Sequence, residues 1–385
     1  MKIAYCIPGL YNSGGMERVL TLKANYFADV LGYDVIVVLT EGKGKDYYYK
    51  LSSRIKVINL DINFDSTYGL PIYIRVFKQI AKERLFKKKL KDTLFYEKPD
   101  ITISLLRREI NFLTSIKDGS IKIGEIHFGR DNFRTLEEYH LPQSVRVFLA
   151  KRWINSFIKK VKELDSFVVL THEDKEKWSE LNNITVIHNP LTFYPAETSD
   201  CSSKQVIAAG RYVPIKRFDH LIEAWAIVSQ KHTDWTLQLY GAGNKEQYQS
   251  LMEKYQLRNC FINPPAPDIE QKYCDSSIFV LSSKNEGFGM VIIEAMACGV
   301  PPVSYDCPCG PKDIITDQED GLLVESGNIS MLAEKIIYLI ENEEIRKEMG
   351  QSARIKSQQF LIDNIGKKWD ELFNYLLRRK HEITD

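Results

Sequence analysis

Residues 1–32 read MKIAYCIPGLYNSGGMERVLTLKANYFADVLG and set the pattern for the whole chain. The apolar run at 3–7 is short and rich in residues that favour a buried strand. A glycine-containing loop follows, and the segment 16–31 has a helical pattern that Gly32 stops. A strand that passes through a tight loop into a helix predicts the first unit of a parallel α/β sheet.

The same alternation of short apolar runs and longer helical segments recurs along the chain. In the first half, the predicted strands are 3–7, 35–39, 55–60, 101–106, 121–128, 167–170 and 184–187. In the second half, they are 205–209, 235–240, 260–262, 278–281 and 300–305, with a helix at 219–230 between the first two. Each half therefore predicts an open parallel sheet covered by helices, an α/β architecture of two Rossmann-like domains.

The length of the chain also predicts two domains. A single hydrophobic core stops growing at about 250 to 300 residues, and this chain has 385 residues. The segment 189–204 contains prolines and serines and suits an exposed linker. We expect an N-terminal domain over 1–190, a C-terminal domain over 191–362 and a final helical segment over 363–385. Ligands of such sheets bind beyond the carboxyl ends of the strands, so two facing domains would form one cleft.

Composition predicts a soluble protein of the cytoplasm. Hydrophobic residues make up 44% and charged residues 27%, which is globular composition. No run reaches the roughly 18 apolar residues of a membrane span, and the start of the chain lacks the features of a signal peptide. The seven cysteines have no zinc-type spacing and are expected to be reduced. Cys307 and Cys309 flank Pro308, where an ordinary loop is favoured over a metal site.

A glycine loop follows the first predicted strand. Gly14 and Gly15 can let the backbone approach a ligand closely, and they precede the predicted helix. The free N–H groups and the dipole of a helix N-terminus favour an anion such as phosphate. The loop lacks the Gly-x-Gly-x-x-Gly pattern, so a plain tight turn is an equal alternative.

A cationic loop follows the first predicted strand of the second half. Gly210 and Arg211 precede Lys216 and Arg217, and a helix begins near residue 219. Arg211 can make a forked contact with phosphate oxygens, and Lys216 can act as a mobile point charge. These two cations at the end of a strand suit a diphosphate, whereas we expect Arg217 to be a solvated surface charge.

The segment 286–294 reads EGFGMVIIE and follows another predicted strand. Gly289, between Phe288 and Met290, has no side chain and would leave the backbone accessible at the start of a helix. Glu294 lies in an apolar segment, where a carboxylate is costly to bury unless it accepts hydrogen bonds. Ribose hydroxyls would be suitable donors, and a buried polar network is the alternative. Glu286 lies in the preceding loop, nearer the expected place of a transferred sugar.

These blocks together resemble glycosyltransferase family 4. The spacing of Glu286 and Glu294 is similar to the family's Glu-x7-Glu motif. Further similar blocks follow the family's order along nearly the whole chain: 14–18 (GGMER), 210–211 (GR) with Lys216, 240–243 (YGAG) and 321–324 (GLLV). The resemblance implies the GT-B fold, an acceptor-binding first domain, a nucleotide-binding second domain and a last helix, 363–379, that returns to the first domain. The block 305–313 is similar to one that often marks enzymes of bacterial surface polysaccharides.

The resemblance also implies roles for individual residues. Arg211 and Lys216 would hold the donor diphosphate, and Glu286 would hold the hydroxyls of the transferred sugar. Glu294 would bind the ribose. The remaining expected contacts are made by the loop residues Gly14 and Gly15 on the phosphate side, by Phe288, Gly289 and Met290 around the nucleotide, and by His127 near the donor sugar. A satisfied core histidine is an equal alternative for His127.

The expected reaction is transfer of a hexose or N-acetylhexosamine from a UDP-sugar to a saccharide acceptor linked to a polyprenyl diphosphate. The sequence has no Asp-x-Asp motif, so we expect no metal and no other cofactor, with cations and helix N-termini balancing the leaving diphosphate. The family retains anomeric configuration, and front-face departure is preferred over a double displacement. A UDP-sugar epimerase of the same fold and a catalytically silent membrane-associated partner are the alternatives. No nucleic-acid partner is expected.

Two basic segments in the first half predict docking at the inner face of the cell membrane. The segment 71–91 contains eight basic residues and one acid, Glu83, interleaved with apolar residues. The segment 142–164 has a similar pattern. A helix packed on its own sheet also has a charged outer face, but such a bias toward one sign is unusual there. We therefore expect both segments to contact an anionic surface as interfacial helices.

Overall fold

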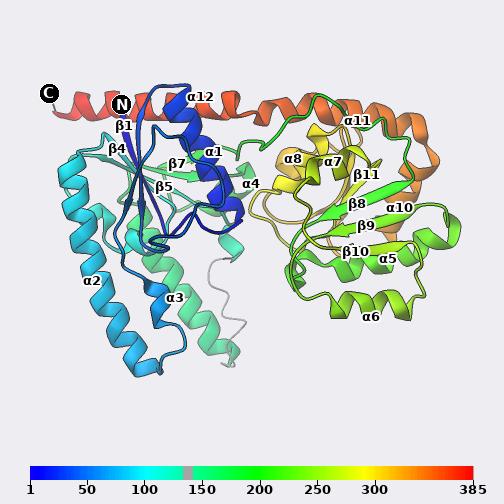
Figure 1. Ribbon diagram of the computed structural model, residues 1–385, viewed down its shortest axis with the longest axis horizontal. Helices are drawn as coiled ribbons and strands as arrows, with labels where there is room; N and C mark the ends of the chain where they lie inside the picture. The colour runs from blue at the N-terminus through cyan, green and yellow to red at the C-terminus, as the bar shows by residue number, and fades with distance from the viewer. Residues whose placement is uncertain (133–141, 385) are drawn as a thin grey trace. The chain divides into compact units, whose positions relative to one another are not determined.

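The computed structural model describes residues 1–132 and 142–384 (Figure 1). The chain divides into two compact units. The first unit comprises Met1–Pro190 and Ile362–Asp385, and the second comprises Leu191–Leu361.

A parallel sheet forms the centre of the first unit. Within its described residues the sheet has seven strands in the order β3-β2-β1-β4-β5-β6-β7. The strands are β1 (Lys2–Ile7), β2 (Asp34–Leu39), β3 (Lys56–Asn59), β4 (Ile101–Ser104), β5 (Ile121–Glu125), β6 (Ser166–Val169) and β7 (Ile184–Val186). Because all recorded pairings are parallel, the loops after β1, β4 and β5 meet at one edge.

A second parallel sheet forms the centre of the second unit. Residues 191–361 are all described, and they contain six strands in the order β10-β9-β8-β11-β12-β13. The strands are β8 (Gln205–Ala209), β9 (Thr236–Tyr240), β10 (Cys260–Asn263), β11 (Ile278–Leu281), β12 (Pro302–Asp306) and β13 (Leu322–Glu325). Strand β11 pairs with both β8 and β12, so the loops that follow these three strands are neighbours.

The predicted α/β class with two Rossmann-like halves is confirmed. Two strands differ from the local predictions. The strand predicted at 121–128 ends at Glu125, because the last ladder hydrogen bond to β6 is made by the Ile126 N–H, and His127 therefore lies in a loop. Strand β13 was not predicted, because its apolar run, 322–324, is only three residues long.

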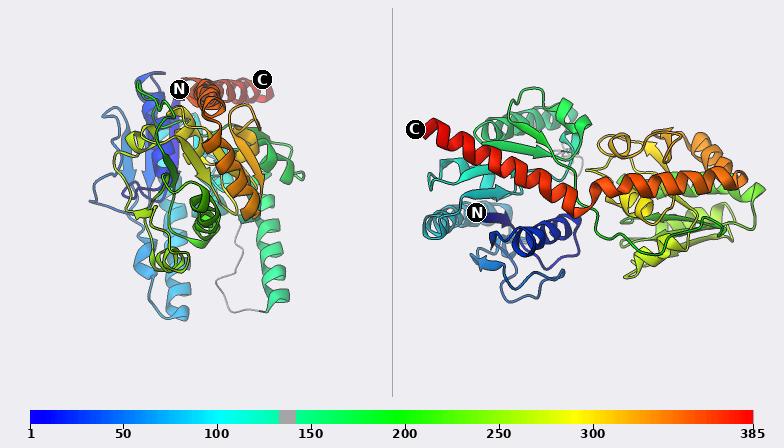
Figure 2. Two further views of the ribbon diagram at one scale, coloured as in Figure 1. Left: turned by 90° about the vertical axis from the view of Figure 1, so that its right-hand side faces the viewer. Right: turned by 90° about the horizontal axis from the view of Figure 1, so that it is seen from above.

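The helices of the first unit are α1 (Gly15–Asp29), α2 (Ile72–Glu97), α3 (Gln143–Val161), α4 (His172–Lys177) and α12 (Ile362–Thr384). Helix α12 lies beside α1, as Figures 1 and 2 show. Phe27 and Phe373 meet edge to face with ring centroids 5.5 Å apart, and the Tyr33 hydroxyl donates a hydrogen bond to Asp370. The last helix therefore completes the core of the first unit.

The helices of the second unit are α5 (Phe218–Lys231), α6 (Glu246–Lys254), α7 (Ile269–Cys274), α8 (Met290–Ala297), α9 (Pro311–Ile314), α10 (Ile329–Glu341) and α11 (Glu343–Ser357). Helices α5 and α10 pack on one another, and Trp225 and Ile336 are fully buried in the core that they share with the sheet. These helices fix the ends of the strands that carry the candidate site.

The segment 189–204 is not an exposed linker, contrary to its composition. The Ser199 hydroxyl donates to the Ser276 carbonyl, and Arg346 donates through Nε to the Cys201 carbonyl at 2.9 Å. Cys201 is 2% exposed. Serine and proline suited a linker, but their polar groups instead bond to the body of the second unit.

Helices α2 and α3 project from the first sheet with their N-terminal ends farthest from it (Figures 1 and 2). The buried residues of α2 are Phe86, Leu90, Leu94 and Glu97, all in its C-terminal half. The buried residues of α3 are Phe157, Ile158 and Val161, again near its C-terminal end. Burial is thus concentrated toward the C-terminal ends of both helices, although Gln79 of α2 also donates to the Thr67 hydroxyl at 3.3 Å. None of the helices in the described part of the chain is long and apolar enough to cross a membrane.

Candidate active site

An ion pair joins two loops that follow neighbouring strands of the second unit. Lys216, at the end of a short turn after β8, places Nζ 2.6 Å from Oε1 of Glu286, in the loop after β11. The Ser283 hydroxyl donates to the same oxygen at 2.6 Å. The structure therefore brings together two residues that the sequence assigned to the diphosphate and to the transferred sugar.

The backbones of these two loops are also bonded to one another. The Ser282 hydroxyl donates to the Lys216 carbonyl at 2.9 Å, and the Lys284 N–H donates to the Ile215 carbonyl at 2.8 Å. Ser282 is 2% exposed, so its hydrogen bond is shielded from water. The position of Lys216 is thus fixed by its backbone, while its flexible side chain carries the charge.

The two arginines of the cationic loop have different environments. Arg211 is exposed and is available to a ligand. Arg217 is half-buried, and within the described residues its Nη1 is shielded from solvent without a hydrogen-bond partner. The prediction that Arg217 is a solvated surface charge is therefore wrong. The backbone is left-handed at Arg217, with φ +46°, and Nη1 lies beside Gly327.

Glu294 is buried in α8, with 4% of the residue exposed. The Thr192 hydroxyl donates to its Oε1 at 3.0 Å. This hydrogen bond belongs to a buried polar network, which was the alternative interpretation of Glu294. Thr192 belongs to the segment that the sequence suggested was a linker, so sequence reasoning did not identify it as a partner.

The loop of Glu286 packs tightly on the loop that contains both Cys307 and Cys309. The Glu286 N–H donates to the Pro308 carbonyl at 3.2 Å. A Cβ on Gly310 would lie 2.1 Å from the Phe288 carbonyl oxygen, so only glycine fits there. Cys307 and Cys309 are buried, and burial raises the pKa of the Cys307 thiol. The two buried side chains support the site by packing.

In the first unit, Gly14 precedes α1 and leaves the helix without a side-chain cap. Gly14 has φ −68°, and Gly15 is not among the residues with positive φ. A Cβ on Gly15 would meet nothing within 4 Å. Neither glycine is therefore required by backbone conformation, and the open surface at Gly15 leaves room for a ligand at the first N–H groups of α1.

His127 follows β5, and its side chain is 11% exposed. Its Nε2 lies 3.2 Å from Oε1 of Glu125, which also forms an ion pair with Lys23 of α1. Sequence reasoning missed Lys23 and Glu125. Both could have been noticed in the sequence, because each is a charged residue within a segment whose pattern predicts burial.

A pocket of about 770 Å³ opens at the carboxyl ends of β1, β2 and β4 in the first unit. Its aromatic lining includes Phe64, Tyr68, Phe128 and Trp153. Its cationic lining is Arg107, Arg108 and Lys160. Arg108 lies over the Phe64 ring, 4.3 Å from its centroid. This pocket could not be predicted from the sequence, because its residues come from separate loops.

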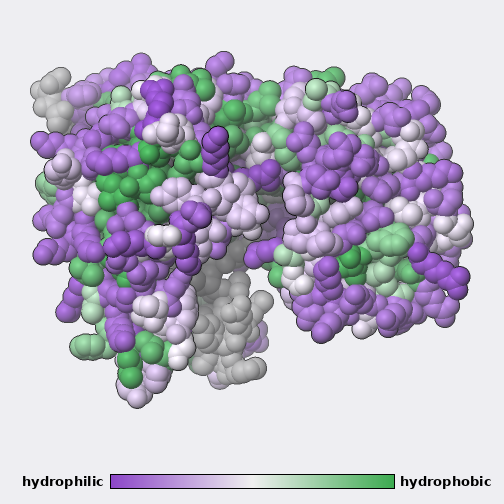
Figure 3. All heavy atoms as spheres, viewed as in Figure 1, coloured by the Kyte–Doolittle hydropathy of each residue, from purple (hydrophilic) through white to green (hydrophobic). Residues whose placement is uncertain are grey.

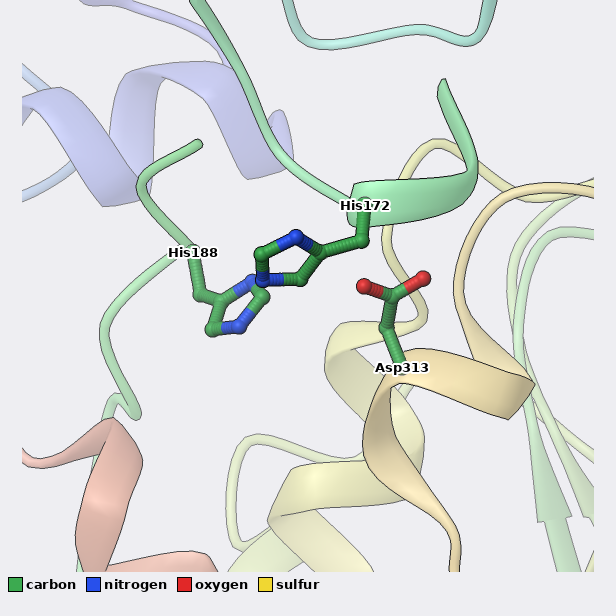
Figure 4. A group of neighbouring side chains, drawn as sticks. All are labelled: His172, His188 and Asp313. Carbon is green, nitrogen blue, oxygen red and sulfur yellow. The ribbon is translucent and has the colours of Figure 1, made fainter. Parts of the chain in front are cut away.

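Two histidines lie at the carboxyl ends of β6 and β7 in the same unit. The rings of His172 and His188 are nearly perpendicular, with centroids 6.0 Å apart (Figure 4). Nδ1 of His188 lies 2.7 Å from the Leu170 carbonyl oxygen, which orients that ring. Neither histidine was a candidate from the sequence.

Comparison with known proteins adds to this geometry. Residues 195–356 match the family model described as "Glycosyl transferases group 1". The chain is 29% identical over 376 residues to an uncharacterized glycosyltransferase of Haemophilus influenzae, which covers 96% of this chain and 98% of that protein. A second relative is the Campylobacter jejuni "GalNAc-alpha-(1->4)-GalNAc-alpha-(1->3)-diNAcBac-PP-undecaprenol alpha-1,4-N-acetyl-D-galactosaminyltransferase". The two sequences are 27% identical over 387 aligned residues, which cover 97% of this chain and 98% of the relative.

A solved structure shares the fold. A mutant of S. aureus TarM, in complex with Fondaparinux, alpha-GlcNAc-glycerol and UDP, has a TM-score of 0.73 and 20% sequence identity, covering 97% of this chain and 99% of that chain.

Two Rossmann-like units with parallel sheets, together with the match in the second unit, define the class of this protein as a glycosyltransferase of the GT-B fold. Within that class, residues 195–356 of the second unit are similar to the glycosyl transferases group 1, whose family model they match.

Proposed function

We propose that the chain is a retaining glycosyltransferase that moves a hexose or N-acetylhexosamine from a UDP-sugar to a polyprenyl-diphosphate-linked saccharide. The contact between Lys216 and Glu286 carries this proposal. The Lys216 ammonium, after β8, lies beside the Glu286 carboxylate, after β11. The cation suits a diphosphate, and the carboxylate suits the hydroxyls of the sugar attached to it.

The donor is held by the second unit in this proposal. Lys216 and the exposed Arg211 stabilise the negative charge that develops on the leaving diphosphate. The N–H groups at the start of α8, from Phe288 to Met290, contact the nucleotide, and Glu294 accepts hydrogen bonds from ribose. Bound donor competes with Glu286 for Lys216, so the ion pair loosens as the diphosphate enters. With these cations in place the reaction needs no metal ion.

The chemistry is front-face departure and attack. The leaving phosphate oxygen takes the proton of the acceptor hydroxyl, and the new glycosidic bond forms on the face that the diphosphate leaves. No protein nucleophile is assigned. His127 contacts the donor sugar, and Gly14 and Gly15 leave space for a phosphate oxygen at α1.

The pocket of the first unit suits the acceptor. Its aromatic side chains can stack on the apolar faces of sugar rings, and its arginines and lysine can bind phosphate. The Campylobacter jejuni relative is named for an acceptor linked to undecaprenol through a diphosphate, which supports an acceptor of this chemical class. The TarM complex contains UDP, which supports the choice of nucleotide.

The proposed membrane contact lies at the free ends of α2 and α3. Large apolar side chains are exposed there: Ile72, Tyr73, Val76, Phe77 and Ile80 on α2, and Val145, Val147 and Phe148 on α3. Hydrophobic side chains at the free end of α2 are visible among hydrophilic ones in Figure 3. Both helices are buried mainly toward their C-terminal ends, so the apolar side chains toward their N-terminal ends are exposed. Their tips are therefore the parts that enter the headgroup region of an anionic bilayer.

One experiment tests the activity. Purified protein is incubated with a panel of UDP-sugars, with and without polyprenyl-diphosphate saccharides, and products are identified by mass spectrometry. The proposal expects glycosylated lipid-linked product and UDP only when both substrates are present. Conversion of the donor sugar without acceptor would identify an epimerase. Absence of any UDP or UDP-sugar binding by calorimetry would identify a catalytically silent partner protein.

A further inference from the structure

A buried ion pair lies directly behind His127 in the core of the first unit. Lys23 of α1 and Glu125 at the end of β5 form this pair, and each side chain is only 1% exposed. The Lys23 ammonium also faces the indole ring of Trp369 from α12, with Nζ 4.4 Å from the ring centroid. Elements distant in the sequence thus enclose one pair of opposite charges.

Such a pair is poor evidence of a purely stabilising role. Desolvation of two charges costs about as much as their attraction returns, and apolar replacements of buried pairs are often neutral or stabilising. Burial lowers the pKa of the Lys23 ammonium, and the ammonium, with His127, holds the pKa of the Glu125 carboxyl well below its usual range. The loss of either charge would leave the other alone in apolar surroundings, so both remain ionised together.

Within the described residues, the pair also makes a polar contact with His127. Oε1 of Glu125 lies 3.2 Å from Nε2 of the imidazole. Nε2 is shielded from solvent and forms no regular hydrogen bond within the described residues, so Oε1 of Glu125 is the charged atom that it faces. A carboxylate accepts and does not donate, so this contact favours a proton on Nε2. Nδ1 is then the ring nitrogen left to meet a ligand.

Lys23 balances the charge of the carboxylate at close range, because its ammonium contacts the same Oε1. The Trp369 ring covers the ammonium, and α12 is therefore part of the support. In many functional sites, a carboxylate or carbonyl group orients a histidine by contacting the ring nitrogen that does not face the ligand. Glu125 has this position relative to His127.

We propose that Lys23 and Glu125 are positioning residues that hold His127 as the Nε2-protonated tautomer, with Nδ1 presented as a hydrogen-bond acceptor to a hydroxyl of the donor sugar. This inference rests on the proposed function for the sugar contact. The orientation of His127 by the pair can be measured without any substrate.

The test uses the double variant Lys23→Met/Glu125→Gln, which removes both charges and keeps similar side-chain shapes. The matched control is Lys122→Met/Asp118→Asn, which removes a second buried ion pair of the same unit. Nitrogen-15 NMR of labelled histidine reports which ring nitrogen carries the proton, and His127→Asn identifies the signal among the seven histidines. If the double variant does not fold, Glu125→Asp, which withdraws the carboxylate by one methylene, replaces it.

The parent and the control should show the Nε2-protonated form of His127, whereas the double variant should show a mixture of tautomers. The kcat of the double variant should fall by about tenfold to a hundredfold, the range found when the outer partner of a metal-bound histidine is removed. Its affinity for UDP, which has no sugar, should not change. An unchanged tautomer in the variant would overturn the inference, as would a changed tautomer with parental kcat. If His127→Asn is itself fully active, the proposed sugar contact is wrong, while the tautomer result still stands.

Discussion

Nζ of Lys216 lies 2.6 Å from Oε1 of Glu286, across 70 residues of sequence. The two side chains are 18% and 10% exposed, so the pair is sheltered but reachable. A cation that already has a carboxylate partner is held in place before the donor binds. A diphosphate with more negative charge than one carboxylate can then take the ammonium.

Replacement of Lys216 by alanine should reduce kcat/KM by about a hundredfold to a thousandfold, which corresponds to about 2 to 4 kcal/mol of lost transition-state stabilisation. Arg211→Ala should have an effect in the same direction. The control is Lys284→Ala, since Lys284 is exposed in the neighbouring loop and contributes its backbone N–H. Steady-state kinetics that show Lys216→Ala and Lys284→Ala to be equally active would remove Lys216 from the mechanism.

Turnover should survive chelation. If Lys216, Arg211 and helix N-termini balance the leaving diphosphate, EDTA-treated enzyme should keep its rate of UDP release, and added magnesium or manganese should not raise it. The comparison should use enzyme dialysed against chelator and assayed in metal-free buffer. Loss of turnover on chelation, with recovery on addition of one of these ions, would show that a metal takes part.

The two glutamates should differ in their effect on UDP. Glu294→Ala removes a proposed ribose contact and should weaken both UDP and UDP-sugar by about tenfold to a hundredfold, as expected for a hydrogen bond to a charged group. Glu286→Ala should weaken only UDP-sugar. Because this variant also releases Lys216, its affinity for UDP should equal or exceed that of the parent. Calorimetry provides both affinities.

Thr192→Val is the matched control for the Glu294 variant, since it removes the hydrogen bond to Glu294 without removing the carboxylate. It should bind UDP nearly as the parent does. The proposed division of roles fails if the variants of Glu286 and Glu294 lose UDP affinity to the same extent.

Charge reversal on α2 should release the protein from anionic liposomes. Lys78, Lys87 and Lys88 are exposed, whereas Lys89 donates to the Leu60 carbonyl and should be kept. Each basic residue near an anionic leaflet contributes about 1 kcal/mol, so the triple glutamate variant should lose at least about a hundredfold in partitioning. Sedimentation with phosphatidylserine-containing vesicles measures it, and UDP affinity should not change.

The matched control for this variant reverses three exposed lysines elsewhere in the first unit, namely Lys50, Lys367 and Lys368. It has the same net charge as the test variant. Equal loss of binding in both would show that overall charge is responsible. Full binding by both would show that α2 is a solvated helix.

Gly310→Ala should destabilise the second unit. Its φ is +149°, and the added Cβ would lie 2.1 Å from the Phe288 carbonyl oxygen. The strain should cost about 1 to 3 kcal/mol, and thermal unfolding should occur several degrees lower. Gly15→Ala is the contrasting variant, since its Cβ meets nothing within 4 Å, and it should be neutral or slightly stabilising. Equal melting temperatures for the two variants would contradict this packing.

Local patterns were enough to predict the parallel sheets. A buried strand of a parallel sheet is a short apolar run, and a helix that covers it has a longer period, so both can be recognised within about ten residues. Glycines and charges after such runs indicated loops at the carboxyl ends of strands. On that basis Gly14, Arg211, Lys216, Glu286 and Glu294 could be chosen as candidates before any contact was known.

Periodicity tells which face of an element is buried, but it does not tell which distant side chain that face will meet. The pairing of Lys216 with Glu286 depends on β8 and β11 being neighbours in the sheet. The burial of Glu125 against Lys23 depends on α1 packing over β5. Only the tertiary structure decided these partners, because the cost of burying a charge is settled by the groups that surround it in space.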